Sequence, residues 1–266
     1  MGEIFKLWEE KIPFYNGGEE PWLTYYPSPI KSGKGSVIIC PGGGYRVRCS
    51  TYEGEDYAEY LNCQGLDAFV LDYRVAPNVH PTPLADARRA IRFVRHNAKK
   101  FGLNPEKIAI MGSSAGGHLA AHAATFIGEI EGETGDEIDK ESYIPNAQIL
   151  CYPVLDKAGH LGSYKNLLGE DGADELCESV TPKNIATEMT PPAFIWHTAE
   201  DQIVDVSNSY RYATRLRELS IPTEMHIFPF GGHGHGLANT TQRANPHVAV
   251  WGELLIRWLR LFGFFA

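Results

Sequence analysis

The sequence predicts an α/β fold in which helices cover both faces of a central, mostly parallel sheet. Short apolar runs rich in β-branched residues alternate along the chain with amphipathic helical patterns, which is typical of a parallel sheet. The chain of 266 residues contains no internal repeat and no linker-like segment. Because this length is still within the reach of one hydrophobic core, a single domain over residues 1–266 is expected.

The first half of the chain predicts three buried strands and two helices. The apolar run 36–40 stops at a proline and three glycines, and a second apolar run covers 68–73. Residues 53–64 between them have a helical pattern. From position 84, apolar residues recur three or four apart, which predicts an amphipathic helix over 84–101. The apolar run 107–111 is the third strand.

The second half continues the alternation. The third strand runs into a helix of small residues over 115–124. Apolar runs at 147–152, 193–197 and 224–228 predict three more strands, and 206–219 predicts a helix before the last of them. A closing helix carries its apolar side chains on one side, namely Val248, Trp251, Leu255, Trp258 and Phe262.

Two segments do not fit the alternation. Residues 128–141 are acidic and rich in glycine, which predicts a surface excursion after a helix. Residues 156–190 have no strand signal and end at two prolines. A long segment of this kind inside a compact domain predicts a lid or a substrate-binding insertion near a functional site.

The charge balance excludes some partners. Thirty-three acidic residues outnumber 24 basic ones, giving a net charge of −9, so binding to nucleic acid or to a membrane surface is not expected. Basic residues gather along the helix predicted at 84–101, where we interpret them as a solvated helix face: Arg88, Arg89, Arg92, Arg95, Lys99 and Lys100.

Cysteine usage and the N-terminus predict a cytoplasmic protein. Five cysteines without a CxxC pair argue for reduced thiols and against a disulfide framework or a zinc site. The first residues are acidic where a signal peptide is basic, and the sequence has no apolar run long enough to span a membrane.

The segment 112–116 reads Gly-Ser-Ser-Ala-Gly and lies between a predicted strand and a predicted helix. G-x-S-x-G in this position is typical of a nucleophile elbow, a tight turn that exposes a strained serine at the helix N-terminus. Only one register puts a glycine two residues before and two residues after a serine. It selects Ser114, and not Ser113, as the candidate nucleophile.

A serine nucleophile needs a base and an acid that orients the base. In an elbow fold both follow the nucleophile in the chain, on loops after later strands. Asp201 follows the strand at 193–197, with Glu200 and Asp205 as rivals, and His233 follows the strand at 224–228, with His235 as its rival.

Backbone N–H groups complete the candidate site. Three glycines follow the first strand in the segment 41–45, where they allow the backbone to approach a substrate carbonyl closely. The N–H of Ala115, directly after the nucleophile, supplies a second donor. We therefore expect the oxyanion hole here.

A metal centre is the weaker interpretation of the other histidines. His118 and His122 lie one helical turn apart, but no third ligand is obvious, so we interpret them as helix packing. His226, His233 and His235 are a second set that a metal could use. The sequence predicts neither a metal nor an organic cofactor.

Taken together, these motifs resemble those of α/β-hydrolase fold esterases, in the acetyl-esterase and acetylxylan-esterase-like branch that is also similar to feruloyl-esterase-like and hormone-sensitive-lipase-like enzymes. The similarity runs from about residue 20 to the C-terminus and is carried by residues 40–45, 71–77, 83–88, 112–120, 200–209 and 233–237.

This resemblance implies a serine carboxylesterase that hydrolyses short acyl esters through an acyl-enzyme. It assigns the nucleophile, acid and base to Ser114, Asp201 and His233, and the oxyanion hole to Gly43, Gly44 and Ala115. Activity is expected to fall at low pH, where histidine, with an ordinary pKa of about 6.5, becomes protonated.

The substrate expected from the resemblance is a small molecule, an acetylated xylo-oligosaccharide, with Tyr45, Tyr152 and residues 156–190 as the expected sugar contacts. His235 and Asp205 depart from the family pattern, which often has an aromatic residue and a proline there, and leave the substrate open. A formamidase, a lactonase or a peptidase on the same fold, and a non-catalytic scaffold, are the alternatives. The oligomeric state is not predicted.

Overall fold

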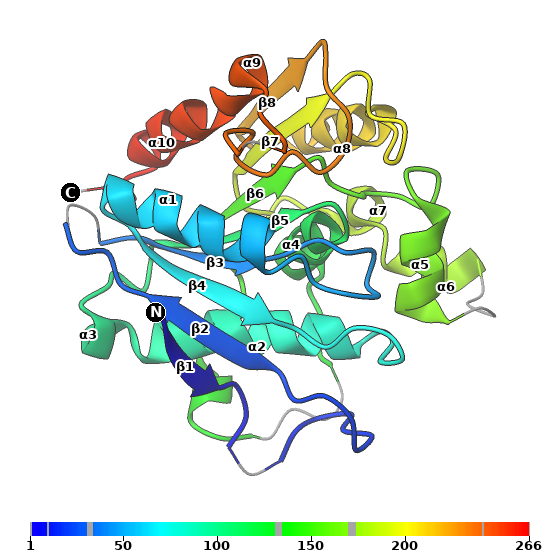
Figure 1. The fold of residues 1–266 in the computed structure, drawn as a ribbon. Helices are drawn as coiled ribbons and strands as arrows, with labels where there is room; N and C mark the ends of the chain where they lie inside the picture. Colours follow the sequence, from blue (N-terminus) through cyan, green and yellow to red (C-terminus); the bar gives the residue numbers. More distant parts are fainter. Residues whose placement is uncertain are drawn as a thin grey trace.

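The computed structural model describes residues 2–9, 11–30, 34–130, 135–169, 174–240 and 242–265, without the side chains of residues 174 and 175. Over these residues the chain forms one eight-stranded sheet, in the order β1-β2-β4-β3-β5-β6-β7-β8, with helices on both faces (Figure 1). The strands are β1 (Glu3–Lys6), β2 (Trp22–Tyr26), β3 (Ser36–Cys40), β4 (Asp67–Asp72), β5 (Ile108–Ser113), β6 (Ala147–Cys151), β7 (Ala193–Thr198) and β8 (Thr223–Phe228).

Strands β3 to β8 pair in parallel, whereas β2 pairs antiparallel with both β1 and β4. The predicted α/β class and mostly parallel sheet are therefore confirmed. The antiparallel pair β1 and β2 at the N-terminal edge was not predicted.

The helices are α1 (Asp56–Gln64), α2 (Thr82–His96), α3 (Ala98–Phe101), α4 (Ala115–Thr125), α5 (Leu161–Leu168), α6 (Asp174–Ser179), α7 (Pro182–Ile185), α8 (Ser207–Glu218), α9 (Pro246–Ala249) and α10 (Trp251–Leu261), with short turns η1 (Thr51–Glu55) and η2 (Ile138–Lys140). Helices α1 and α10 cover one face of the sheet, and α2, α4 and α8 cover the other (Figure 1).

Strand β3 shows why the central runs are apolar at every position. Ile38 packs into the core beneath α2 and α4, while its neighbours Val37 and Ile39 pack into the core beneath α1 and α10. Side chains alternate between the two faces of a strand, so a strand covered on both faces needs apolar residues throughout.

Two predicted elements differ in detail. The helix predicted over 53–64 begins with the π-helical turn η1 and continues as α1, and the helix predicted over 84–101 is divided at Asn97 into α2 and α3. The segment 156–190 contains three short helices, α5, α6 and α7. Part of it, residues 170–173, lies outside the described residues, as do residues 131–134 of the predicted excursion.

The interpretation of the basic helix face as solvated is wrong for its four arginines. Arg88, Arg89, Arg92 and Arg95 are each less than a tenth exposed, because the segment after α4 folds back over α2. Arg89 pairs with Asp136 and Asp139. Arg88, Arg92 and Arg95 donate to backbone carbonyl groups of the same segment. Arginine suits this position because its planar group donates several hydrogen bonds at once.

No helix in the described ranges has both the length and the apolar character needed to cross a lipid bilayer. The five cysteines are free thiols.

Three histidines pack together in the core beside α4. The ring centroids of His80 and His122 lie 5.3 Å apart and those of His118 and His122 lie 5.5 Å apart. Burial lowers the pKa of His80 and of His118 to about 4, and that of His122 well below the ordinary 6.5. The predicted packing role of His118 and His122 is confirmed, and the cluster is neutral at neutral pH.

The free energy of unfolding is expected to fall as the pH drops from 6.5 toward 4. Because the folded pKa of His118 lies below its unfolded value of 6.5, the unfolded chain binds protons first, and the stability present above pH 6.5 is lost. At about pH 5, His118 alone lowers the free energy of unfolding by about 2 kcal/mol. Urea denaturation at both ends of this pH range measures the loss.

Two variants separate the buried cluster from other acid effects. The buried Nε2 of His122 has no hydrogen-bond partner among the described groups, so His122→Leu removes a titrating ring without breaking a bond at that atom. This variant is expected to lose less stability on acidification than the wild type. The exposed His247→Gln serves as the control and is expected to lose as much as the wild type. Equal losses in all three proteins would contradict the prediction.

Candidate active site

Ser114 occupies a sharp turn between β5 and α4, with φ of +53°. A non-glycine residue in this region is strained, and such strain is typical of functional positions. The flanking glycines make the turn possible: a Cβ on Gly112 would lie 2.0 Å from the carbonyl oxygen of Gly116, and a Cβ on Gly116 would lie 2.0 Å from that of Cys40. The segment therefore folds as the predicted elbow.

A continuous chain of hydrogen bonds joins three loops at the carboxyl edge of the sheet. Nε2 of His233 lies 2.8 Å from Oγ of Ser114, and Nδ1 of His233 lies 2.6 Å from Oδ2 of Asp201. Because Nδ1 faces a carboxylate, it carries the ring proton in the neutral state, and Nε2 is free to accept the serine proton. The structure thus brings together the three residues expected from the sequence.

Asp201 is held from several sides. Its Oδ1 accepts hydrogen bonds from the backbone N–H groups of Ile203 and Val204, both at 2.9 Å, and Nε2 of the buried His197 lies 3.0 Å from Oδ2. Burial by itself would raise the pKa of Asp201, but the hydrogen bonds from His197, His233 and the backbone outweigh it and hold the pKa below the ordinary value. The carboxylate is therefore ionised and fixed in place.

The rival acids and the rival histidine have other partners. Glu200 accepts from the N–H of Gly231 at 3.1 Å, and Asp205 accepts from the N–H of Ser207 at 2.8 Å, at the start of α8. Nδ1 of His235 lies 3.5 Å from the carbonyl oxygen of Arg243. None of the three takes part in the hydrogen-bond chain described for Ser114.

The glycine-rich loop after β3 passes directly over the nucleophile. A Cβ on Gly42 would lie 3.1 Å from Cβ of Ser114, and Gly43 and Gly44 have φ of +133° and +66°. Among the described residues, the N–H groups of Gly43, Gly44 and Ala115 donate to no protein acceptor. These groups are therefore available to an oxygen atom bound above Ser114.

The expectation that Tyr45 and Tyr152 contact a sugar is wrong, because both side chains are 1% exposed. The hydroxyl of Tyr45 hydrogen-bonds Nδ1 of His118 at 2.7 Å, inside the core. Tyr152 lies beneath the site, where its ring packs edge-on against His233 with centroids 5.1 Å apart. Aromatic residues at strand ends are core residues here, and the sequence could not distinguish the two cases.

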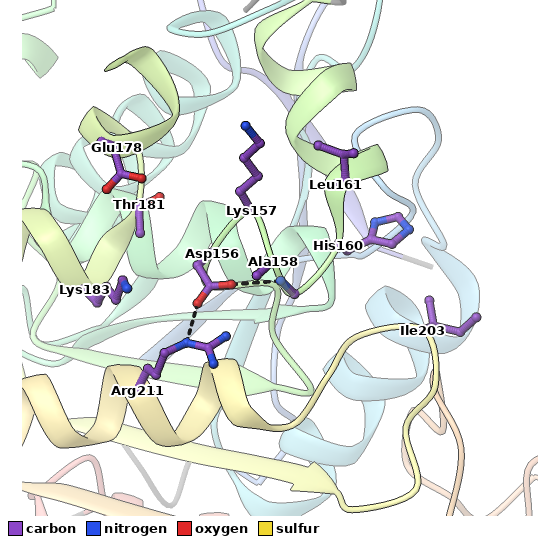
Figure 2. A pocket seen from close by; sticks show the side chains of 11 residues that line it. Asp156, Lys157, Ala158, His160, Leu161, Glu178, Thr181, Lys183, Ile203 and Arg211 are labelled. Atoms are coloured by element: carbon purple, nitrogen blue, oxygen red, sulfur yellow. Dashed lines mark hydrogen bonds and ion pairs between the residues drawn. The ribbon is translucent and has the colours of Figure 1, made fainter. Parts of the chain in front are cut away.

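A cleft of about 700 Å³ lies between the segment 156–183 and the start of α8 (Figure 2). In Figure 2, Asp156 bonds Arg211 of α8, with Glu178 toward one end of the cleft and Ile203 toward the other. Ile203 also lines the smaller hollow formed by Asp201 and His233. His160 lines the cleft, and its pKa is lowered by burial and by the nearby charge of His233. The cleft therefore has both polar and apolar walls and shares Ile203 with the hollow beside Asp201 and His233.

The described residues contain no group of three histidine, cysteine or acidic side chains arranged to hold a metal ion. The alternative set at 226, 233 and 235 is not assembled: Nε2 of His226 lies 2.8 Å from Glu224, and His233 is bonded to Ser114 and Asp201.

Sequence reasoning missed three residues around the site. His197 was identified only as the end of a strand, His160 lay in the predicted insertion 156–190 without being singled out, and Glu53 was one of several acids in a predicted helix. None belongs to a recognisable motif: His197 contacts Asp201 four residues further on, whereas Glu53 contacts Tyr152 far along the chain.

The profile of the BD-FAE family matches residues 24–216. The chain is 36% identical over 241 residues to endo-1,4-beta-xylanase B of Butyrivibrio fibrisolvens, covering 88% of this chain and 38% of that protein. It is 32% identical over 208 residues to acetylxylan esterase of Xylanibacter ruminicola, covering 76% of this chain and 41% of that protein. The chain thus spans about two fifths of the length of these curated relatives.

A solved structure is similar over the whole chain. The acetyl ester-xyloside bifunctional hydrolase from Caldicellulosiruptor lactoaceticus has a TM-score of 0.92 and 39% identity, covering 100% of this chain and 98% of that one. A thermophilic esterase from Thermogutta terrifontis with bound propionate has a TM-score of 0.81 and 25% identity, covering 100% of this chain and 96% of that one.

Proposed function

The chain belongs to the BD-FAE family, and from this premise we propose that it is a serine hydrolase that releases acetyl groups from acetylated xylo-oligosaccharides. The observation that carries the proposal is the unbroken hydrogen-bond chain from Ser114 through His233 to Asp201 at a strained elbow. The relatives named acetylxylan esterase and acetyl ester-xyloside hydrolase support the acetyl group and the xylan-derived alcohol.

The first step forms an acyl-enzyme. Oγ of Ser114 attacks the ester carbonyl while Nε2 of His233 takes its proton, and the carbonyl electrons move onto oxygen. The oxyanion hole is formed by the N–H groups of Gly43, Gly44 and Ala115. Asp201 holds the ring and stabilises the imidazolium that forms. Collapse breaks the ester C–O bond, and the departing sugar oxygen takes the proton from His233 and leaves as a hydroxyl group.

The second step returns the enzyme to its starting state. Water gives a proton to Nε2 of His233 and attacks the acetyl carbonyl, and the same N–H groups hold the second oxyanion. When the bond to Ser114 breaks, the serine oxygen recovers its proton from His233 and acetic acid leaves, which ionises to acetate in water.

The sugar side of the substrate lies in the cleft that shares Ile203 with the hollow beside Asp201 and His233. The residues 156–190 supply most of its walls, including Asp156, His160 and Thr181. Their carboxylate, imidazole and hydroxyl groups suit a leaving group rich in hydroxyls, which offers many donors and acceptors. This assigns the segment 156–190 to substrate binding, the role expected for a lid or an insertion.

Acetate release from acetylated xylo-oligosaccharides tests the proposal, with aryl acetate, aryl butyrate, aryl formamide, lactone and aminoacyl substrates in parallel. The wild type is expected to favour the acetylated sugars, and Ser114→Ala to lose activity by about 10³-fold or more. EDTA is expected to leave the rate unchanged. Cleavage of aryl acetates alone would refute the sugar assignment, and an active Ser114→Ala would refute the mechanism.

A further inference from the structure

A buried carboxylate lies beneath the site without belonging to the hydrogen-bond chain of Ser114. The side chain of Glu53 in η1 is 2% exposed. A buried carboxylate is costly unless it is well paired, so its partners indicate its purpose. Oε2 accepts from the N–H of Gly42 at 2.9 Å, and Oε1 accepts from the hydroxyl of Tyr152 at 2.6 Å.

These two bonds connect the two loops of the site. Gly42 begins the loop that passes over the nucleophile, and a Cβ there would lie 2.6 Å from Oε2 of Glu53 and 3.1 Å from Cβ of Ser114. The hydroxyl of Tyr152 also accepts from the N–H of Gly236, three residues after His233. The carboxylate therefore links the glycine-rich loop to the histidine loop.

The backbone of Tyr152 is strained in a way that serves this link. Its φ is +36°, a value unfavourable for a residue with a side chain, and it follows directly after β6. This conformation directs the hydroxyl to Glu53 and keeps the ring edge-on against His233, with centroids 5.1 Å apart. Tyr152 thus contacts both the carboxylate of Glu53 and the ring of His233.

The ionisable groups that interact with Glu53 come from several elements, namely Cys49, Tyr52, Tyr57, Tyr73, Cys151, Tyr152, His233 and Arg243. The tyrosines and cysteines are neutral, because burial raises the pKa of each. The two that can carry positive charge are His233 and Arg243. Burial raises the pKa of Glu53, and its hydrogen bonds and these two cations act against that rise.

We propose that Glu53 is a positioning residue for acyl transfer. Its carboxylate fixes the glycine-rich loop after β3 through Gly42, and its negative charge supports the imidazolium of His233. The inference rests on the proposed function. Both oxygens of the carboxylate accept hydrogen bonds, as they do in the ionised form. The charge is then present when His233 takes the proton of Ser114, and loss of the charge makes that step less favourable.

Glu53→Gln and Glu53→Ala separate the charge from the anchor. Gln keeps an acceptor for the N–H of Gly42 but removes the charge. In this variant the acidic limb of the pH profile of kcat/KM is expected to move by about half a pH unit or more toward lower pH. The reason is that the imidazolium of His233 forms less readily without a negative charge beside it. Ala also releases the loop, and kcat is expected to fall by about 100-fold, the effect of losing one oxyanion donor.

Tyr57→Phe is the matched control for Tyr152→Phe. The hydroxyl of Tyr57 lies 3.0 Å from Oγ of Ser113 and 3.3 Å from the hydroxyl of Tyr152, but it makes no hydrogen bond to Glu53 or to the histidine loop. Tyr152→Phe is expected to lower kcat about tenfold, whereas Tyr57→Phe is expected to keep the wild-type rate and acidic limb. An unshifted limb in Glu53→Gln, or equal losses in the two tyrosine variants, would overturn the proposal.

A second readout keeps this test separate from that of the substrate. The rate at which a fluorophosphonate labels Ser114 depends on the same base and oxyanion loop, and needs no sugar ester. The same pH shift is expected for labelling. A wild type that is labelled but releases no acetate would refute the proposed substrate and leave the Glu53 test decidable. A wild type that is neither labelled nor active would overturn both proposals.

Discussion

Replacement of Asp201 by asparagine is expected to lower kcat by about 10⁴-fold while the protein stays folded. Oδ1 of an asparagine can still accept from the N–H groups of Ile203 and Val204, as Oδ1 of Asp201 does now. Its amide group, however, would donate to Nδ1 of His233 and force the ring proton onto Nε2. That nitrogen then faces Ser114 as a donor, and it can no longer take the serine proton.

The matched control is Asp205→Asn, which changes the same side chain four residues away. Asp205 is exposed and bonds only the start of α8, so its replacement is expected to leave kcat within about twofold of the wild type. Initial rates on an aryl acetate, with circular dichroism to confirm folding, measure both variants. If Asp205→Asn lost the activity and Asp201→Asn kept it, the orienting acid would be assigned to the wrong residue.

The catalytic geometry was predictable because its signals are local. A Cβ at Gly112 or Gly116 would collide with backbone atoms at 2.0 Å, so the two glycines and the serine between them specify the elbow on their own. The acid and the base follow strands whose ends meet at the same edge of a parallel sheet. Strand order therefore brings Asp201 and His233 together without any information from distant contacts.

The surroundings of the site were less predictable because burial depends on what packs over a side chain. Tyr45 and Tyr152 follow strand ends, as substrate contacts often do, yet helices and loops cover both. The arginines of α2 alternate with apolar residues, as they would on a solvated helix face. In the folded chain, however, the segment after α4 covers them and its carbonyl groups accept their hydrogen bonds. The edge strand β1 is four residues long and mostly exposed, so its pattern contains little information.

Removal of the buried carboxylate at Asp86 is expected to cost more stability than any other single change considered for this protein. The side chains of Asp86 and Arg74 are both 0% exposed, and three N–H groups of Arg74 donate to the two carboxylate oxygens at 2.7 to 3.0 Å. Asp86→Ala leaves the guanidinium buried without its counter-charge. Breaking such a pair lowers the free energy of unfolding by about 3–5 kcal/mol.

Urea denaturation of Asp86→Ala and of Glu137→Ala separates a buried pair from an exposed one. Glu137 binds Lys140 at 2.5 Å on the surface, where both side chains are more than half exposed, so its loss is expected to change the free energy of unfolding by less than about 1 kcal/mol. The contact between Glu137 and Lys140 is thus shorter than that between Asp86 and Arg74 but contributes less. Water solvates the surface charges after their pair is broken, whereas the side chain of Arg74 is fully buried. Similar losses in the two variants would show that Arg74 finds another partner when Asp86 is removed, and that its contact with the carbonyl of Pro13 is enough to hold it.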